Sequence, residues 1–504
     1  MNHTLESINA KSYEGNLVYL YGDDTAVRSL PLNRKEADAV QARRERGRDF
    51  VMVFDRLPYH LFFVSFDSER QAPDCQERLR RAAAEVQREL TADADAAVAV
   101  TGGGTIPEEV AAFVEGLTIA DYSFDRYVGK ERHHLQTVVV DSLFLGDDEL
   151  QASQRLWNRI FWCREWVNLP VQDLNAQQFA DELASIAADL EGVGCTVMDR
   201  KQIESLRMGG LLAVNRGSVD EPRFVVLEYN GMPRAKRKAS RADAVDAPIC
   251  LVGKGVMFDT GGLNIKPGDY MSEMKSDMAG AATMASVLFA AADNHLPVHL
   301  VALLPMTDNR PGGNAYAPDD IVTMYDGTTV EVVNTDAEGR LILADAIAYA
   351  AKNYNPRLIV TAATLTGAAV RAISTFGIAA MQQNAADPLT MMRLVGEQVY
   401  ERLVEFPMWR EYDEMIKSDY ADLRNSTMSP QAGTITAGKF LAHFAGDKPF
   451  IHLDIAGVAY FTKAQQYYRV GASGYGIRLL YAFLQMQDML AAEKNNSKTS
   501  KKSR

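Results

Sequence analysis

Short, fully apolar segments alternate with alanine-rich stretches of helical length through most of this chain. The apolar runs lie near residues 223–230, 248–253, 298–305 and 357–362, and the helical stretches lie near 176–190 and 278–292. Strands that are buried on both faces read as continuous apolar runs, and parallel strands need helical crossovers between them. The alternation therefore predicts an α/β fold with a mainly parallel sheet flanked by helices.

The chain is too long for one hydrophobic core, because single cores stop growing at ~250–300 residues and this chain has 504. Residues 1–145 mix short apolar runs with a charged helical stretch at 75–91, which predicts a smaller N-terminal α/β domain. A long helix over 146–169 is expected to link it to a larger domain at 170–492. The polar and basic residues 493–504 are expected to form a disordered tail.

Composition excludes several classes of partner. The net charge of −13 disfavours nonspecific binding to nucleic acid or to an anionic membrane. The four cysteines are widely scattered, which argues against a disulfide framework and suits a reducing cytoplasm; they are Cys75, Cys163, Cys195 and Cys250. The N-terminus has no charged and apolar leader, and no apolar stretch approaches the ~20 residues that span a bilayer. We therefore expect a cytoplasmic protein without a membrane partner.

Residues 334–341 read Asn-Thr-Asp-Ala-Glu-Gly-Arg-Leu and place Asp336, Glu338 and Arg340 two positions apart. In an extended segment alternate side chains point the same way, so two carboxylates and a guanidinium would face one spot. A β-hairpin over 321–333 would deliver them there. Hard cations suit the carboxylates, and a bound anion suits the arginine. Taken alone, the segment could equally be a strand end that runs into a helix cap.

A second segment, residues 251–283, places four more charged side chains in glycine-rich or turn-rich surroundings after an apolar strand. They are Lys254, Asp259, Lys266 and Asp277. Asp277 stands just before an expected helix, where an acid serves as a cap or as a ligand. In open α/β sheets the active crevice lies at the carboxyl ends of the strands. Each acid alone is more often a cap or a turn residue, but the two segments together indicate one site.

These two segments resemble the signature regions of the leucyl (cytosol) aminopeptidase family, the two-metal peptidases of the M17 type. NTDAEGRL resembles the hallmark octapeptide, and GKGVMFDTGGLNIKP followed by MKSDMAGAA resembles the other metal-binding stretch. The likeness continues through MGGLLAVNRGS, GNAYAPDDIV, ATLTGA, AGTITAGKFL and HLDIAG. It covers the C-terminal two-thirds of the chain and implies that residues 170–492 form a catalytic domain, whereas the N-terminal third resembles the family only weakly.

The resemblance implies two divalent metal ions in each subunit, with Mn²⁺ or Zn²⁺ as the expected metals. Asp259 and Glu338 resemble the acids that bridge the two ions. Asp336 would complete the more exchangeable site, and Asp277 and Lys254 would complete the tighter one. A lysine ligand must be neutral, because an ammonium group has no lone pair. Without the resemblance, Lys254 reads as an ion-pair partner for Asp259.

The implied reaction is hydrolysis of the N-terminal residue from a peptide, by a water that two metals bridge. Lys266 resembles the lysine that stabilises the developing oxyanion. Arg340 resembles the arginine that holds a bicarbonate ion, which acts as the general base. His452 is the histidine nearest by motif, and we expect it to be structural.

The family's substrate pocket falls on uncharged, small or soft residues in this sequence. They are Met274, Thr364, Gly367 and Ala456, with Ala459 as a further candidate. Such a pocket implies a preference for leucine and similar apolar residues at a free N-terminus, whereas aspartate or glutamate should be poor. The resemblance also implies a homo-hexamer.

Two other functions compete with the aminopeptidase. One is a different two-metal hydrolase, such as a phosphoesterase, which the apolar pocket argues against. The other is a non-enzymatic DNA-binding role, which the net charge of −13 argues against. The glycine-rich residues 101–105 lack a full phosphate-loop pattern and read as a turn. The basic run at 234–241 reads as a solvated loop.

Overall fold

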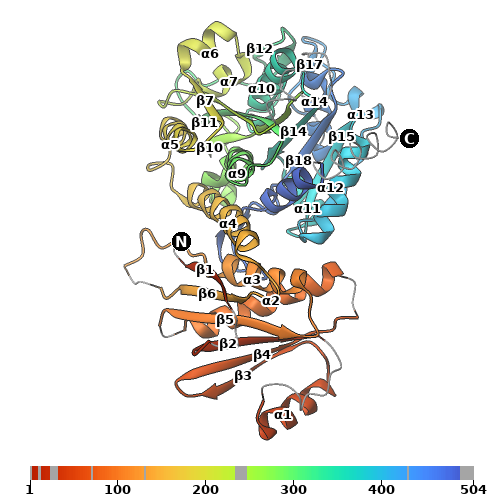
Figure 1. The fold of residues 1–504 in the computed structure, drawn as a ribbon. Coiled ribbons are helices and arrows are strands. Elements are labelled where there is room, and N and C mark those ends of the chain that lie inside the picture. Colours follow the sequence, from red (N-terminus) through yellow and green to blue (C-terminus); the bar gives the residue numbers. More distant parts are fainter. Residues whose placement is uncertain are drawn as a thin grey trace, which may run out of the picture. The chain divides into compact units, whose positions relative to one another are not determined.

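The structure is a computed structural model, and it describes residues 3–8, 13–22, 32–69, 72–92, 94–129, 132–232, 247–427, 429 and 431–487. Two compact units are present (Figure 1). The first comprises Met1–Phe161 together with Phe461–Gly471, and the second comprises Trp162–Tyr460 with Ala472–Arg504. The expected tail at 493–504 and the basic run at 234–241 lie outside the described residues.

The first unit is built on a six-stranded sheet in the order β1-β6-β5-β2-β4-β3. Its pairs are parallel except for β3 and β4, which are antiparallel. The strands are β1 (Thr4–Ile8), β2 (Asn16–Tyr21), β3 (Phe50–Arg56), β4 (Tyr59–Ser65), β5 (Ala96–Gly103) and β6 (Leu135–Asp141). The glycine-rich residues 101–105 end β5 and turn into the following helix.

Among the described residues, the helices that accompany this sheet are α1 (Arg34–Arg44), α2 (Ala72–Leu90) and α3 (Pro107–Asp121). Helices α2 and α3 approach closely at Gly116, where a Cβ atom would lie 2.5 Å from the Cα of Arg80. The segment Phe461–Gly471 is anchored on the same two helices by an apolar cluster. The cluster contains Ala84, Ile119, Ala120, Phe461, Tyr467 and Tyr468.

The second unit contains a nine-stranded sheet in the order β16-β15-β18-β14-β9-β11-β8-β7, with β10 paired to β11. Its strands are β7 (Val193–Met198), β8 (Arg223–Asn230), β9 (Ile249–Gly253), β10 (Gly255–Asp259), β11 (His299–Asn309), β14 (Leu358–Ala363), β15 (Ile378–Gln383), β16 (Leu403–Glu405) and β18 (Phe450–Asp454). The central pairs are parallel, and antiparallel pairs join β7 to β8, β8 to β11 and β15 to β18. The predicted α/β class with a mainly parallel sheet is confirmed.

Helices cover both faces of this sheet. On one face, Cys250 and Val252 of β9 share a buried core with α10 (Gly339–Tyr354). Alternate strand residues point to opposite faces of a sheet. Gly253, which follows Val252, therefore faces the other side, where it packs against α9 (Ala279–Asp293). Cys250 is fully buried, as expected, and all four cysteines are free thiols.

Further helices are α4 (Asp147–Asn168), α5 (Ala176–Asp189), α6 (Arg200–Leu206), α7 (Gly209–Asn215), α11 (Gly367–Ile373), α12 (Ala386–Gln398), α13 (Glu411–Glu414) and α14 (Gly433–Ala445). Residues 477–487 are also helical. Helix α4 occupies the position of the expected long helix at 146–169. Two 3-10 turns, η3 (Gly268–Met271) and η4 (Met274–Met278), precede α9. Within the described residues, no helix is both long and apolar enough to cross a membrane.

The predicted hairpin at 321–333 is confirmed. Strands β12 (Ile321–Thr323) and β13 (Thr329–Glu331) pair antiparallel, and β17 (Leu423–Arg424) adds a parallel partner to β13. The hairpin leads the chain directly into residues 334–341. Short strands β19 (Tyr460–Phe461) and β20 (Gly471–Ala472) flank the segment that returns to the first unit.

Candidate metal centre

The charged residues predicted from the two segments gather where parallel strands end. Lys254 follows β9, Asp259 is the last residue of β10, and Thr364 follows β14. Glycines let α9 approach these strand ends: a Cβ on Gly280 would lie 2.1 Å from the carbonyl oxygen of Ala362. This close approach brings Asp277, in η4, to the carboxyl end of the sheet, where α/β proteins place their active sites.

Three carboxylates form the centre of the cluster. Asp259, Asp336 and Glu338 each offer one oxygen, and these atoms all lie within 4.8 Å of one another. Asp259 and Glu338 are buried, whereas the side chain of Asp336 is 34% exposed. The sequence prediction that the two segments form one site with these acids at its centre agrees with this arrangement.

The local geometry assumed for residues 334–341 was wrong. The segment is not extended: Thr335 and Asp336 form a turn, and α10 begins at Gly339. Glu338 is the N-terminal cap of α10, with φ −74° and ψ −40°, although its side chain makes no capping hydrogen bond. Asp336 and Glu338 therefore converge through a turn and a helix start rather than through the alternation of a strand, and Arg340 belongs to the first turn of α10.

Two lysines neutralise the acids. The Nζ atom of Lys254 lies 2.7 Å from Asp277 Oδ1 and 2.8 Å from Glu338 Oε1. The Nζ atom of Lys266 lies 2.7 Å from Asp259 Oδ2 and 2.5 Å from Asp336 Oδ1. Lys254 thus pairs with Asp277 and Glu338, rather than with Asp259 as its sequence surroundings suggested.

Burial and mutual repulsion shift the protonation of these groups. Burial and the charge of Glu338 raise the pKa of Asp259, and burial, Glu338 and Asp259 raise that of Asp336 to about 6. Burial works to raise the pKa of Glu338 as well, but Lys254 and Lys266 outweigh it and lower that pKa. Burial opposes the charge of Lys254, yet Asp277 and Glu338 raise its pKa, so a neutral Lys254 would require a nearby cation.

The donors of this cluster fit divalent cations. Among the described residues, the buried oxygens Asp277 Oδ2 and Glu338 Oε2 have no hydrogen-bond partner. Buried carboxylate oxygens without partners are costly, and oxygen-rich clusters are the usual ligands of hard divalent ions. A divalent ion would satisfy these oxygens and relieve the repulsion among the acids.

A buried polar network holds the acids in place. Asn309, at the end of β11, donates from Nδ2 to Asp259 Oδ1 at 2.8 Å and to the carbonyl of Thr335 at 3.0 Å. Tyr316 donates to the same carbonyl at 2.6 Å. The hydroxyl of Thr335 donates to the carbonyl of Gly261 at 2.6 Å. The turn that carries Asp336 is thereby fastened to the loop after Asp259.

Asn425, after β17, fixes the other side of the same turn and is fully buried. Its Oδ1 accepts from the N–H of Val333 at 2.8 Å, and its Nδ2 donates to the carbonyl of Asn334 at 2.7 Å. Its backbone carbonyl accepts a hydrogen bond from Nη1 of Arg340 at 2.8 Å. One residue therefore orients both the acidic turn and the buried arginine.

Asp454, the last residue of β18, brings most of the expected substrate-pocket residues together. Its Oδ1 accepts from the backbone N–H groups of Leu365, Thr366 and Ala456. Its Oδ2 accepts from the Thr366 hydroxyl at 2.7 Å. The turn that contains Thr364 and Gly367 is thus held beside Ala456.

The same surroundings include Met274, which begins η4. Asp277 of that turn accepts a hydrogen bond from Thr364 Oγ1 at 2.8 Å, which connects η4 to the strand end at Thr364. Thr364, Met274 and Ala456 are partly exposed and Gly367 is exposed, whereas Ala459 is buried.

His452 has the surroundings of a structural residue. It is fully buried in β18, and its Nδ1 lies 2.7 Å from the Thr361 hydroxyl. Burial and the charge of Arg340 lower its pKa to about 3, so the imidazole is neutral at ordinary pH.

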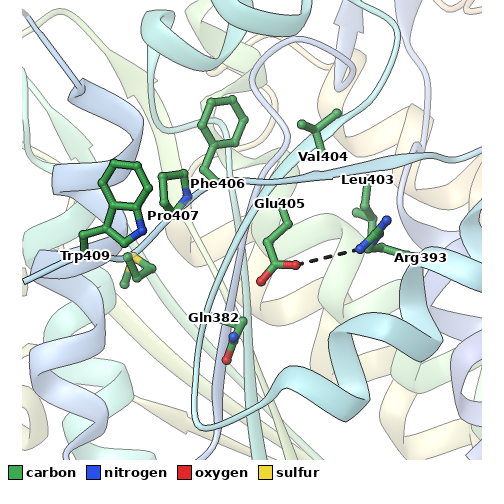
Figure 2. Close-up of a pocket in the computed structure, with 9 residues that line it drawn as sticks. Gln382, Arg393, Leu403, Val404, Glu405, Phe406, Pro407 and Trp409 are labelled. Carbon is green, nitrogen blue, oxygen red and sulfur yellow. Dashed lines mark ion pairs between the residues drawn. The ribbon is translucent and has the colours of Figure 1, made fainter.

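A cavity of about 630 Å³ lies elsewhere in the second unit, around the edge strand β16 (Figure 2). Residues 403–409 line it, together with Gln382 and Arg393. Its charged groups, Arg393 and Glu405, pair with each other at 3.9 Å. None of the residues predicted for the site lines this cavity, so its size alone does not mark it as the functional site.

Sequence reasoning missed the residues that position the acids, namely Asn309, Tyr316, Thr335, Asn425 and Asp454. Asn309 and Asp454 each stand at the end of an apolar strand, which is a signal that could have identified them. Asn425 lies 91 residues from Asn334 in the chain, and no local pattern marks it.

The fold and the site define an α/β protein with an acidic, cation-binding centre at the carboxyl ends of its strands. Residues 161–481 match the catalytic domain of the cytosol aminopeptidase family. The chain therefore belongs to this family, and the resemblance inferred from its motifs is confirmed. Membership supports metal-dependent aminopeptidase activity, and with it hydrolysis of peptides.

Individual relatives agree with the assignment. The probable cytosol aminopeptidase of Geobacter sulfurreducens is 41% identical over 396 residues, which cover 77% of this chain and 77% of the relative. That of Roseiflexus castenholzii is 39% identical over 452 residues, which cover 86% and 89%. Among solved structures, the bottromycin maturation enzyme BotP in complex with Mn is 28% identical with a TM-score of 0.79, covering 94% of this chain and 100% of that one.

Proposed function

We propose that this protein is a leucyl aminopeptidase that removes leucine and similar apolar residues from the free N-terminus of peptides. The observation that carries the proposal is the cluster of Asp259, Asp336 and Glu338. At this cluster the buried oxygens Glu338 Oε2 and Asp277 Oδ2 have no hydrogen-bond partner in the described part of the chain. Family membership supplies the reaction class, and the chemistry of the surrounding residues supplies the roles.

Two divalent ions would be held by this cluster, and Mn²⁺ and Zn²⁺ suit its carboxylate donors. Asp259 and Glu338 would serve both ions, Asp336 would serve the more exposed one, and Asp277 with Lys254 would serve the buried one. When bound, the ions would polarise a carbonyl and lower the pKa of a water molecule. That the solved structure of BotP is a complex with Mn supports this choice.

Lys266 would stabilise negative charge that develops on the substrate carbonyl. Its ammonium group is mostly buried between Asp259 and Asp336, and these acids raise its pKa although burial opposes its charge. It therefore stays protonated and can donate a hydrogen bond to an oxyanion.

Arg340 would bind an anion, which we propose to be bicarbonate. It is buried, and its Nε has no hydrogen-bond partner among the described residues. Burial lowers its pKa to about 10, which still leaves it charged at neutral pH. A bicarbonate beside this cation would supply a general base in a site whose nearest histidine, His452, is held neutral inside the sheet.

The proposed pocket for the first side chain is lined by Met274, Thr364, Gly367 and Ala456. None of the four carries a charge, so an apolar side chain can enter without leaving an ion unpaired. Discrimination between apolar side chains that differ by a methylene should be modest, in the range of ~10–200-fold. Aspartate and glutamate should be poor substrates.

We further propose that the protein is cytoplasmic and forms a homo-hexamer. The location rests on relatives named cytosol aminopeptidases and on the scattered free cysteines. The hexamer rests on the family resemblance and on the general prevalence of closed symmetry among soluble oligomers.

The direct test compares Leu-Gly amide with acetyl-Leu-Gly amide at pH about 8, in the presence of Mn²⁺. An aminopeptidase of this kind needs the free α-amine, so the first peptide should be cleaved and the acetylated one should not. Equal turnover of both peptides would refute action from the N-terminus. Hydrolysis of a phosphate ester with neither peptide cleaved would favour the alternative two-metal hydrolase.

A further inference from the structure

A second cavity, in the first unit, has basic walls. It has a volume of about 430 Å³, and its lining includes Arg88, Thr91, Val128, Arg132, His133 and Arg469. Such a concentration of positive charge is notable on a chain whose net charge is −13. None of these residues takes part in the proposed peptidase site.

The basic residues come from three separate parts of the first unit. Arg88 lies in the last turn of α2, Arg132 and His133 precede β6, and Arg469 lies in the segment Phe461–Gly471. The neighbours of Arg469, Tyr467 and Tyr468, are buried in the apolar cluster with α2 and α3. The fold therefore holds Arg469 at this cavity.

Two of the guanidinium groups, those of Arg88 and Arg469, have no carboxylate within ion-pair distance in the described part of the chain. Arg88 Nε donates to the carbonyl of Ala84, and Arg469 Nε donates to the carbonyl of Ala120, each at 3.2 Å. Among the described residues, neither arginine forms an ion pair with a carboxylate. Their terminal nitrogens keep the donor geometry that suits phosphate and carboxylate oxygens.

The acids near the cavity lie beside other basic side chains. Asp125 lies 3.3 Å from Arg132 Nε, and Asp95 lies 3.7 Å from His133 Nδ1. Asp121 is fully buried beside His3 and His134. None of these acids lies within ion-pair distance of Arg88 or Arg469, although Asp121 and Asp125 act on Arg469 from farther away.

The like charges near Arg469 also affect its pKa. Burial lowers its pKa, and the charges of Arg132 and Arg88 lower it further, although Asp121 and Asp125 oppose this. An anion in the cavity would relieve this repulsion.

We propose that this cavity binds a small organic phosphate, with phosphoryl oxygens held by Arg88 and Arg469 and by the flanking Arg132 and His133. A phosphoryl group offers several acceptor oxygens and up to two negative charges, which matches cations that converge from three directions. A water molecule takes ~30 Å³ in the liquid, so a bare phosphate would leave most of the cavity empty. The net negative charge of the chain favours a small ligand over a nucleic acid.

The test is isothermal titration calorimetry of the full-length protein with inorganic pyrophosphate and with ADP as probes. The variants Arg88→Gln and Arg469→Gln each remove one unpaired cation. Arg78→Gln is the matched control, because Arg78 lies on the same helix α2 but pairs with Glu85 at 3.3 Å and does not line the cavity. Melting temperatures without ligand report whether each variant folds. If Arg469→Gln unfolds, Arg88→Gln still tests the proposal, because Arg88 is exposed and its substitution should not disturb the fold.

We expect saturable binding of at least one probe to the wild type. The affinity should fall about tenfold or more in Arg88→Gln and in Arg469→Gln and stay unchanged in Arg78→Gln, because a charge-assisted hydrogen bond is lost only in the first two. Equal binding by all three variants would place the probe elsewhere, for example on metal ions at the acidic cluster, and would overturn the proposal. The proposal would also be overturned if neither probe bound at millimolar concentration, or if a DNA duplex bound and neither probe did.

Discussion

Asn425→Ala should damage the candidate site without touching any of the proposed metal ligands. The substitution removes the two short hydrogen bonds to Val333 and Asn334 and leaves the N–H of one and the carbonyl of the other without these partners. Each orphaned group costs ~1–3 kcal/mol. Because Val333 and Asn334 are only partly buried, water can reach them and the lower half applies. We expect a loss of about 2–4 kcal/mol.

This loss of free energy affects either kcat/KM alone or the melting temperature as well, depending on how far the structural change spreads. If it is confined to the turn that carries Asp336, the active geometry becomes a minor population, and each 1.36 kcal/mol lowers kcat/KM tenfold. Hydrolysis of Leu-Gly amide should then fall by about 30- to 1000-fold. If it spreads through the unit, the melting temperature should fall as well.

Asn353→Ala is the matched control. Asn353 is an exposed asparagine on α10 that bonds the Tyr349 carbonyl and the Tyr325 hydroxyl, away from the acids. Its loss should change stability by less than about 0.5 kcal/mol, as is usual for surface positions. If Asn425→Ala matched Asn353→Ala in both kcat/KM and melting temperature, the positioning role assigned to Asn425 would be wrong.

Three further predictions concern the arginine, the first unit and the assembly. Arg340→Ala should keep the bound metals and lower kcat by ~10²–10⁴, the range for one acid–base group; metal analysis alongside kinetics checks this, and a metal-free variant would contradict it. In the first unit, the imidazoles of His134 and His3, whose Nδ1 atoms lie 3.5 Å and 3.7 Å from Asp121 Oδ2, act with the N–H of Leu135 to outweigh burial and lower the pKa of Asp121 to about 2 from 3.8, which corresponds to about 2 kcal/mol. This stability is present above pH 4 and lost as pH falls toward 2. In denaturant unfolding, the free energy of unfolding of Asp121→Asn should therefore fall less between pH 4 and pH 2 than that of the wild type; identical dependence on pH would refute this. Finally, sedimentation at micromolar concentration should give six times the 55.6 kDa monomer mass, and a monomer would rule out the hexamer.

The sequence predicted strands β8, β9, β11 and β14 and helices α4, α5 and α9, because continuous apolar runs and alanine-rich stretches mark them. It did not predict which pairs are antiparallel, because the continuous apolar run of a buried strand such as β8 is compatible with either strand direction. Nor could it assign residues 461–471 to the first unit, because a boundary drawn along the chain cannot show a segment that returns.

The acids predicted for the candidate site do lie together in the structure, but the geometric reason given for this was partly wrong. Asp336 and Glu338 do approach Asp259, yet they do so through a turn and a helix start. Strand alternation was the simplest reading of acids two positions apart, and it failed because Thr335 is bonded to Gly261 and Asn309. Those contacts join residues far apart in the chain, so local pattern could not reveal them.

The most direct test of the central claim is the metal content of the purified protein and of two variants, measured by mass spectrometry after dialysis against Mn²⁺ or Zn²⁺. We expect two ions per wild-type chain. We expect Asp259→Ala and Glu338→Ala each to lose both ions, since each acid is proposed to bind both. Two ions retained in Glu338→Ala, with full aminopeptidase activity, would contradict the assignment of this cluster as the metal centre.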